Sequence, residues 1–234
     1  MKKVLLFVLA ATLIFSTSAM ASPTVFFGED LSPSATVPAG GNAVNARNSF
    51  FSNLVGVGTE DFESLSQGAT NLSLAFPGSS GSITATLAGG GSVFTFPGAG
   101  RFATSGTNWY NQDPGEAAFT ISFSSAISAF GFYGTDIGDF GGNITLALLN
   151  GGTVNLVVPN TTGAPDGSLL FYGFYDTSNA YVSITFGNTS GADGFGFDDM
   201  VIADLQQIVP TPEPTTMLLL GLGVLGLAGL RKRD

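Results

Sequence analysis

The sequence contains no cysteine and no histidine among its 234 residues. Disulfide bonds are therefore excluded, and so are zinc sites built from Cys or His ligands. Catalytic triads that pair serine or cysteine with histidine are excluded for the same reason. Carboxylate, hydroxyl, tyrosine and backbone groups remain to carry any chemistry.

Basic residues are scarce between the two ends of the chain. Of the 7 Lys and Arg residues, only Arg47 and Arg101 lie within residues 22–209, whereas all of the 17 acidic residues except Glu213 and Asp234 lie there. A nucleic-acid-binding surface needs clustered positive charge. We therefore expect no nucleic-acid partner.

The N-terminus has the three parts of a secretory signal peptide. Lys2 and Lys3 precede an apolar stretch from Val4 to Phe15, and Ala19-Met20-Ala21 follows. A basic start, a short apolar stretch and small residues at Ala19 and Ala21 predict export and cleavage after Ala21. Residues 1–21 are assigned to this signal.

The C-terminus carries a second hydrophobic segment. Pro212-Glu213-Pro214 leads into an apolar run of 14 residues from Met217 to Leu230, which Arg231-Lys232-Arg233 closes. As a helix this run would be roughly 21 Å long, against a bilayer core of about 30 Å. Because Lys and Arg stay on the cytoplasmic side, the preceding domain is expected to lie outside the cell.

This ordered tail resembles the PEP-CTERM sorting signal of exported bacterial proteins. The matching residues are Pro212, Glu213, Pro214, Arg231, Lys232 and Arg233. The resemblance implies an exosortase-type membrane protease as a partner, a transient stay in the inner membrane, and sorting to the cell surface or beyond. It also implies an association with exopolysaccharide. An ordinary C-terminal membrane anchor is the alternative interpretation of residues 210–234.

The region between the two signals, residues 22–209, alternates between apolar and polar residues in several short runs. Such runs, separated by Gly- and Pro-rich turns, predict antiparallel strands. About ten of them indicate an all-β, two-sheet sandwich resembling a jelly roll, with an N-terminal signal helix and a C-terminal transmembrane sorting helix outside it. Residues 22–58 fit either an irregular lead-in or a strand followed by an amphipathic turn around Ala43–Leu54. The runs are 82–87, 119–124, 144–148, 153–158, 182–186 and 195–205.

Two acidic pieces lie near the expected first and last strands. Glu63 and Asp198 are predicted to approach each other there, together with Asp61 and Asp199. An isolated buried charge is costly, and a hard cation such as Ca²⁺ would compensate carboxylates that point inward. The alternative is that backbone N–H groups or water satisfy them. These two segments, Asp61-Phe62-Glu63 and Phe197-Asp198-Asp199, resemble short sequences that open and close MAM-type and carbohydrate-binding jelly rolls. The resemblance implies a structural cation.

Two loops are candidates for ligand binding. Asp136, Asp139 and Asn143 lie on a glycine-rich stretch that could surround a cation or accept hydrogen bonds from sugar hydroxyls, although such residues also serve ordinary turns. Trp109 and Tyr110 lie in a polar, Gly/Asn-rich stretch, where aromatic faces could stack on sugars. The alternative for Trp109 is that it plugs the end of the sandwich.

The sequence thus predicts an exported, surface-sorted, non-catalytic protein of the extracellular matrix or biofilm that binds glycan or adheres. A purely structural matrix protein without a ligand is one alternative. A carbohydrate-active hydrolase using carboxylates such as Asp136 and Asp139 is a less favoured one.

Overall fold

The computed structural model describes residues 22–31, 34–112, 119–139, 141–190 and 194–209. The predicted signal helix and the predicted sorting helix lie outside these residues. Within the described part of the chain, no helix is long and apolar enough to cross a membrane.

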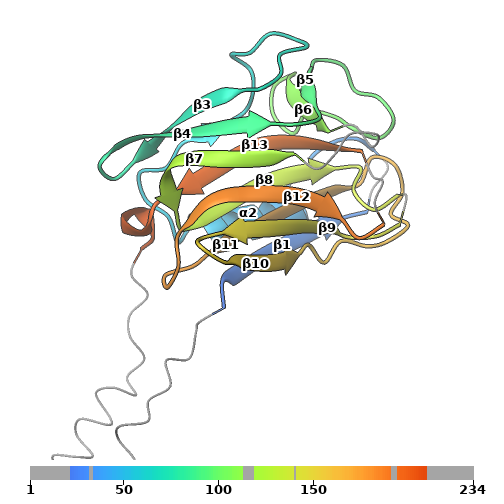
Figure 1. The fold of residues 1–234 in the computed structure, drawn as a ribbon. Helices are drawn as coiled ribbons and strands as arrows, with labels where there is room; N and C mark the ends of the chain where they lie inside the picture. The colour runs from blue at the N-terminus through green and yellow to red at the C-terminus, as the bar shows by residue number, and fades with distance from the viewer. Residues whose placement is uncertain (1–21, 32–33, 113–118, 140, 191–193, 210–234) are drawn as a thin grey trace, which may run out of the picture.

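Two antiparallel sheets face each other and form a sandwich, as the sequence predicts (Figure 1). One sheet has the order β1-β11-β8-β13-β6-β5, with β2 paired to β13, and the other has the order β10-β9-β12-β7-β4-β3. From β6 onward the chain passes repeatedly from one sheet to the other, as in a jelly roll. The strands are β1 (Thr24–Asp30), β2 (Thr59–Glu60), β3 (Ser73–Gly78), β4 (Gly81–Ala88), β5 (Ser92–Phe94), β6 (Trp109–Gln112), β7 (Thr120–Ile127), β8 (Ala129–Thr135), β9 (Ile144–Leu149), β10 (Thr153–Val157), β11 (Leu169–Tyr175), β12 (Tyr181–Asn188) and β13 (Phe195–Ala203).

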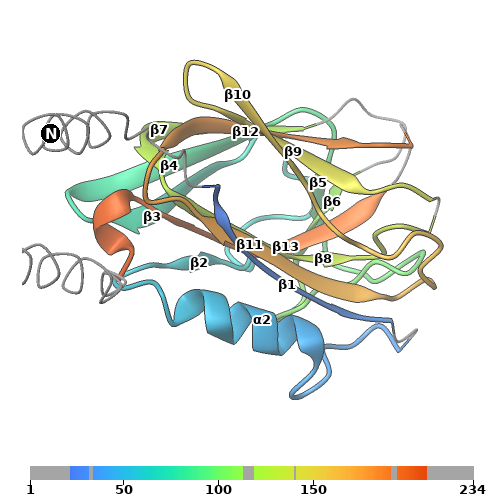
Figure 2. The same ribbon diagram turned by 90° about the horizontal axis from the view of Figure 1, so that it is seen from below.

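A helix, α2 (Asn42–Phe51), adds a third layer on the outer face of the β1-containing sheet (Figure 2). Ala43, Ala46 and Phe50 point from the helix into a small apolar cluster shared with that sheet. Of the two alternatives for residues 22–58, a strand followed by an amphipathic turn is therefore closer to the structure than an irregular lead-in. The segment expected to form the turn is a full helix, α2. Its sequence, rich in Asn and Ser, carries too narrow an apolar stripe to be recognised by helical periodicity.

Aromatic rings fill the main core between the sheets. Phe197 on β13 is fully buried, and its ring centroid lies 5.0 Å from that of Phe132 and 5.6 Å from that of Phe119. Phe62, Phe130 and Phe186 complete its ring contacts. Phe197 thus contacts rings from both sheets.

The predicted runs 144–148 and 153–158 form a hairpin, because β9 and β10 pair from Leu149↔Thr153 onward with Asn150-Gly151 in the turn between them. The last strand is shorter than predicted. It ends at Ala203, and a 3-10 turn, η1 (Leu205–Gln207), follows with Asp204 as its cap. The strands number more than the predicted ten, since several were not visible as alternating runs.

Candidate functional site

The two acidic segments, 60–63 and 198–199, lie at neighbouring strands of one sheet. β2 pairs with β13 in the register Met200↔Glu60, so the segment 61–63 follows directly beside the last strand. Asp199 sits at an irregularity of β13 between Asp198 and Val201, with a left-handed φ of 49°. Backbone strain of this kind in a residue other than glycine often marks a specialised position.

Glu63, Asp198 and Asp199 all accept hydrogen bonds from one short loop, residues 104–108. Asp198 Oδ2 accepts from the backbone N–H of Thr104 at 2.7 Å and of Ser105 at 3.3 Å. Asp199 Oδ1 accepts from the Ser105 hydroxyl at 2.9 Å. Glu63 accepts from the backbone N–H groups that follow, Thr107 at 2.6 Å and Asn108. These carboxylates therefore anchor the loop that leads into β6.

Gly106 explains how the loop can approach so closely. Its φ is +57°, and a Cβ atom there would lie 2.3 Å from the Glu63 carboxyl carbon. Any side chain at this position would push the loop off its carboxylate anchor. The Asp61 carboxylate is used locally, since its Oδ1 accepts from the Glu63 N–H at 3.2 Å. A cation held by Glu63, Asp61, Asp198 and Asp199 stays a prediction.

Burial, together with the adjacent Asp199 charge, raises the pKa of Asp198 to about 8. The hydroxyl of Thr104 lies 3.0 Å from Asp198 Oδ2 and 2.8 Å from Asp199 Oδ2. A hydroxyl has one proton, so it can donate to only one of these two oxygens. A proton on one carboxyl would satisfy the other contact, in agreement with the raised pKa.

We expect the folded protein to lose stability between about pH 5 and pH 8 in the presence of a chelator. The pKa of Asp198 rises from 3.8 to about 8 on folding and that of Asp136 to about 7. The folded state therefore binds more protons than the unfolded state in this window, and the free energy of unfolding falls as pH rises. The loss should be on the order of 6 kcal/mol. Urea unfolding at several pH values measures it.

Asp198→Asn should flatten this pH dependence, because the variant has one titrating carboxyl fewer. Glu63 and Asp176 have pKa values lowered by their hydrogen bonds, so they titrate below this window. A stability that is constant or rises from pH 5 to pH 8 would contradict the interpretation.

A second acidic cluster lies on the predicted glycine-rich loop. Among the described residues, Asp136, Asp139 and Asp166 form the group whose carboxylates each place an oxygen within 4.8 Å of the others, and it could bind a metal ion. Burial raises the pKa of Asp136 to about 7, and the charge of Asp139 adds to the effect. Asp166 comes from the loop before β11 and was not singled out from the sequence.

Asn143, predicted with Asp136 and Asp139, has a different role in the structure. Its amide donates to the carbonyl oxygens of Val158 at 3.2 Å and Asn160 at 2.9 Å. It therefore ties the start of β9 to the segment after β10, which agrees with the alternative of turn chemistry.

Arg101 connects the acidic cluster to the loop between β5 and β6. Its Nε lies 4.0 Å from Asp136 Oδ2, and its Nη1 donates to Asn111 Oδ1 at 2.8 Å. Gly100, with φ +79°, makes the close approach possible, because a Cβ atom there would lie 1.9 Å from Asp136 Oδ1. The loop between β5 and β6 thus contacts carboxylates in its middle, at Gly100 and Arg101, and at its end, at residues 104–108.

Trp109 and Tyr110 do not lie in an exposed loop, and this prediction of their position was wrong. They are the first two residues of β6, with exposed fractions of 1% and 0%. Tyr110 packs on Phe62 and Phe119 in the main core. The polar residues that precede Trp109, within 104–108, donate hydrogen bonds to Glu63, Asp198 and Asp199. Their polarity therefore did not indicate an exposed loop.

Trp109 instead forms part of a groove beside the same loop, with a cavity volume of about 450 Å³. Two phenylalanines there are exposed, Phe94 by 37% and Phe96 by 69%. The sequence signal for them, Phe94-Thr95-Phe96-Pro97, is a short aromatic run without a motif. The groove is lined by Gln67, Phe94, Phe96, Pro97, Gly98, Ala99, Arg101, Trp109 and Asn111.

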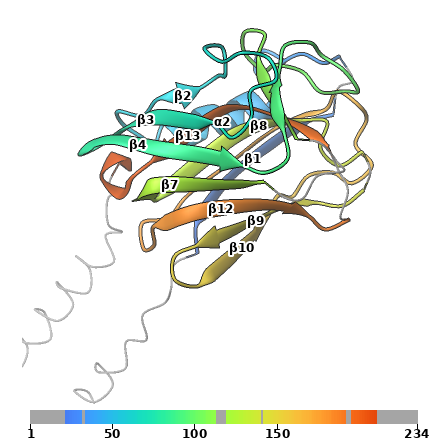
Figure 3. The same cartoon turned by 45° about the horizontal axis from the view of Figure 1, so that its top comes forward.

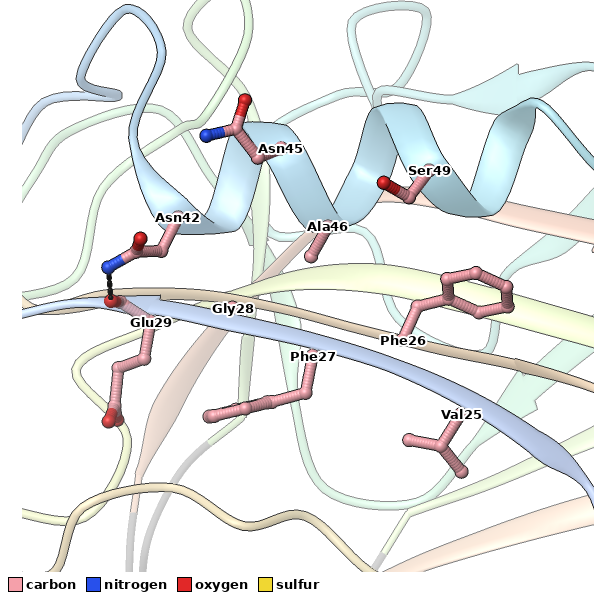
Figure 4. A pocket seen from close by; sticks show the side chains of 9 residues that line it. All are labelled: Val25, Phe26, Phe27, Gly28, Glu29, Asn42, Asn45, Ala46 and Ser49. Atoms are coloured by element: carbon pink, nitrogen blue, oxygen red, sulfur yellow. Dashed lines mark hydrogen bonds between the residues drawn. The ribbon is translucent and has the colours of Figure 1, made fainter.

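A second groove runs between β1 and α2 (Figure 4). The amide of Asn42 donates to the Glu29 carbonyl at 2.9 Å, and the amide of Asn45 donates to the Gly40 carbonyl at 3.1 Å. Phe26 packs against Phe50 and Tyr175. The side chains bordering this groove are thus already engaged in holding α2 against the sheet.

Solved structures that resemble the fold include several surface and binding domains. The CBM22-1 xylan-binding domain of Paenibacillus barcinonensis Xyn10C is 13% identical, with 66% of this chain and 96% of that chain covered and a TM-score of 0.39. The K2 cleaved adhesin domain of Lys-gingipain is 14% identical, with 62% and 97% covered and a TM-score of 0.35. TmCBM61 in complex with β-1,4-galactotriose is 15% identical, with 50% and 86% covered and a TM-score of 0.26. With TM-scores this low, the similarity does not extend to the residues of a binding site.

The sequence comparisons concern the C-terminus. No curated protein matches the chain. Residues 210–233 match the PEP-CTERM protein-sorting motif, which agrees with the order of PEP box, apolar run and basic cluster in the sequence. The chain therefore ends in a PEP-CTERM sorting signal, which indicates export and processing by an exosortase.

Proposed function

We propose that this chain is an exported, non-catalytic protein that is sorted to the cell surface and binds glycan in the extracellular matrix or biofilm. The observation that carries the proposal is the sorting motif at residues 210–233, joined to an acidic β-sandwich. The motif indicates export, which supports a location of the sandwich outside the inner membrane. Its partners are an exosortase-type protease, the inner membrane before processing, and extracellular polysaccharide.

The groove beside the β5–β6 loop supports glycan binding over the alternatives. It combines exposed aromatic rings with amide and guanidinium groups, which is the composition of small-molecule sites. Of the two carboxylates considered for a hydrolase, Asp136 approaches Arg101, and both belong to the acidic cluster to which we assign a structural cation below.

Co-sedimentation of the released protein with the producing cell's extracellular polysaccharide tests the proposal. We expect saturable binding and no increase in reducing ends. Absence of binding, with a matrix that weakens when the protein is deleted, would favour the purely structural alternative. Release of reducing ends would establish the hydrolase.

The acidic cluster supports a structural cation, and we assign Ca²⁺ to it. Calcium prefers six to eight oxygen ligands, and the cluster offers carboxylates without histidine or cysteine. Asp139 Oδ1 is buried and has no hydrogen-bond partner among the described residues, so an ion would satisfy it. The ion would also offset the mutual repulsion of Asp136 and Asp139.

Calcium is expected to raise the melting temperature of the wild type. A ligand that binds only the folded state adds about 2.7 kcal/mol at a hundredfold excess over its Kd. Asp139→Asn should abolish the increase, and Asp198→Asn should keep it. If calcium raises the melting temperature of Asp139→Asn but not that of Asp198→Asn, the ion binds instead at the site predicted from the sequence, which contains Asp198. An equal melting temperature of the wild type with calcium and with chelator would contradict calcium binding at either site.

A further inference from the structure

We propose that the groove formed by Phe94, Phe96, Pro97, Arg101 and Trp109 binds a chain of neutral pyranose sugars. This inference rests on the proposed glycan-binding function and gives it a site and a ligand class. Most of the residues that line the groove belong to β5, to β6 and to the loop between them. Figure 3 shows the sandwich with the top of Figure 1, where β5 and β6 lie, turned toward the viewer.

The first argument is the exposure of two neighbouring phenylalanines. Phe96 is 69% exposed and Phe94 37%, although most other phenylalanines of the described chain lie in the two cores. Phe94 packs on Trp109 with ring centroids 5.5 Å apart, so its ring is held in place from below. Aromatic rings with a fixed position beside a groove can stack on the C–H faces of pyranose rings.

The second argument is a buried polar group that lacks a partner. Trp109 is 1% exposed and forms the floor of the groove, yet its indole N–H has no hydrogen-bond partner within the described chain. Buried donors are nearly always satisfied, so an orphaned one needs an explanation. A sugar hydroxyl entering beside Phe94 would accept this hydrogen bond.

The third argument concerns the charge of the ligand. Arg101 is the single cation lining the groove, and it is engaged by Asn111 and faces Asp136. The carboxylates that dominate residues 22–209 repel polyanions. The ligand is therefore neutral, and Gln67 and Asn111 supply the polar groups that orient its hydroxyls.

Trp109 is the only tryptophan in the chain, so its fluorescence reports directly on the groove. The released protein is titrated with neutral β-1,4-linked oligosaccharides of gluco, xylo, manno and galacto configuration, and with an oligogalacturonate. We expect at least one neutral oligosaccharide to shift Trp109 emission saturably and the oligogalacturonate to have no effect. Calorimetry measures the affinity independently of fluorescence.

Phe96→Ala should weaken that binding roughly tenfold without unfolding the protein, because this side chain is largely exposed. The matched control is Val157→Ala on β10, a side chain 53% exposed on the opposite sheet, which should bind as the wild type does. Trp109→Phe removes the N–H donor and should also weaken binding.

The outcomes separate this site from the proposed function. Calorimetric binding that Phe96→Ala leaves unchanged, with constant Trp109 emission, would overturn the groove while glycan binding stands. Preference for the oligogalacturonate would overturn the neutral ligand class. An emission change that depends on protein concentration alone would assign the groove to contacts between copies of the chain. Absence of binding to every sugar, including the native polysaccharide, would overturn both.

Discussion

Protein released from the cell surface is expected to end near residues 212–216, without Met217–Asp234. The sorting motif covers residues 210–233, and we propose that an exosortase-type protease recognises it in the membrane and cleaves the chain at the PEP box. Replacing Pro212, Glu213 and Pro214 by alanine should therefore leave the full-length chain in the inner membrane. Intact-mass measurement of the surface-released and membrane fractions distinguishes the two forms.

Pro210→Ala is the matched control, because it changes a neighbouring proline outside the PEP box and should be processed normally. If all of the released protein keeps Met217–Asp234, the tail is an ordinary anchor and the assignment of a cleaved signal is wrong.

Phe197→Ala should destabilise the folded domain by about 3–5 kcal/mol. The side chain is fully buried, and its ring contacts rings from both sheets, so truncation leaves a cavity that the sandwich cannot close. Since a whole domain is stable by only about 5–15 kcal/mol, much of the protein should unfold near physiological temperature. Urea unfolding at 25 °C measures the loss.

Phe96→Ala serves as the control for this change, because the same atoms are removed from a side chain that is 69% exposed. Its effect on stability should stay within about 0.5 kcal/mol. Equal destabilisation by both variants would mean that the core is not organised around Phe197.

Alternation in the sequence predicted one sheet much better than the other. Of the predicted runs, all but the last became β4, β7, β9, β10 and β12, which belong to a single sheet with one face toward solvent. Strands β8 and β11 were missed because they lie between the other sheet and α2, so both faces are buried. A strand buried on both faces shows no period of two.

The acidic residues of the site were easier to predict than its aromatic ones. Asp198 and Glu63 stood out because the chain has few cations to pair with them, and in the structure both accept hydrogen bonds from one loop, residues 104–108. Phe94 and Phe96 did not stand out among 21 phenylalanines, since exposure depends on tertiary packing. The position of Trp109 was predicted wrongly because its polar neighbours in the sequence suggested an exposed loop, whereas the residue is buried in β6.

The described chain begins just before β1 and ends just after η1, and both of these ends lie on the opposite side of the sandwich from β5 and β6 (Figure 1). An anchor attached after residue 209 would therefore hold the sandwich by the side away from β5 and β6, and would leave the groove beside these strands uncovered. Polysaccharide emerging around the cell would find this groove open, so capture can begin before the protease releases the protein.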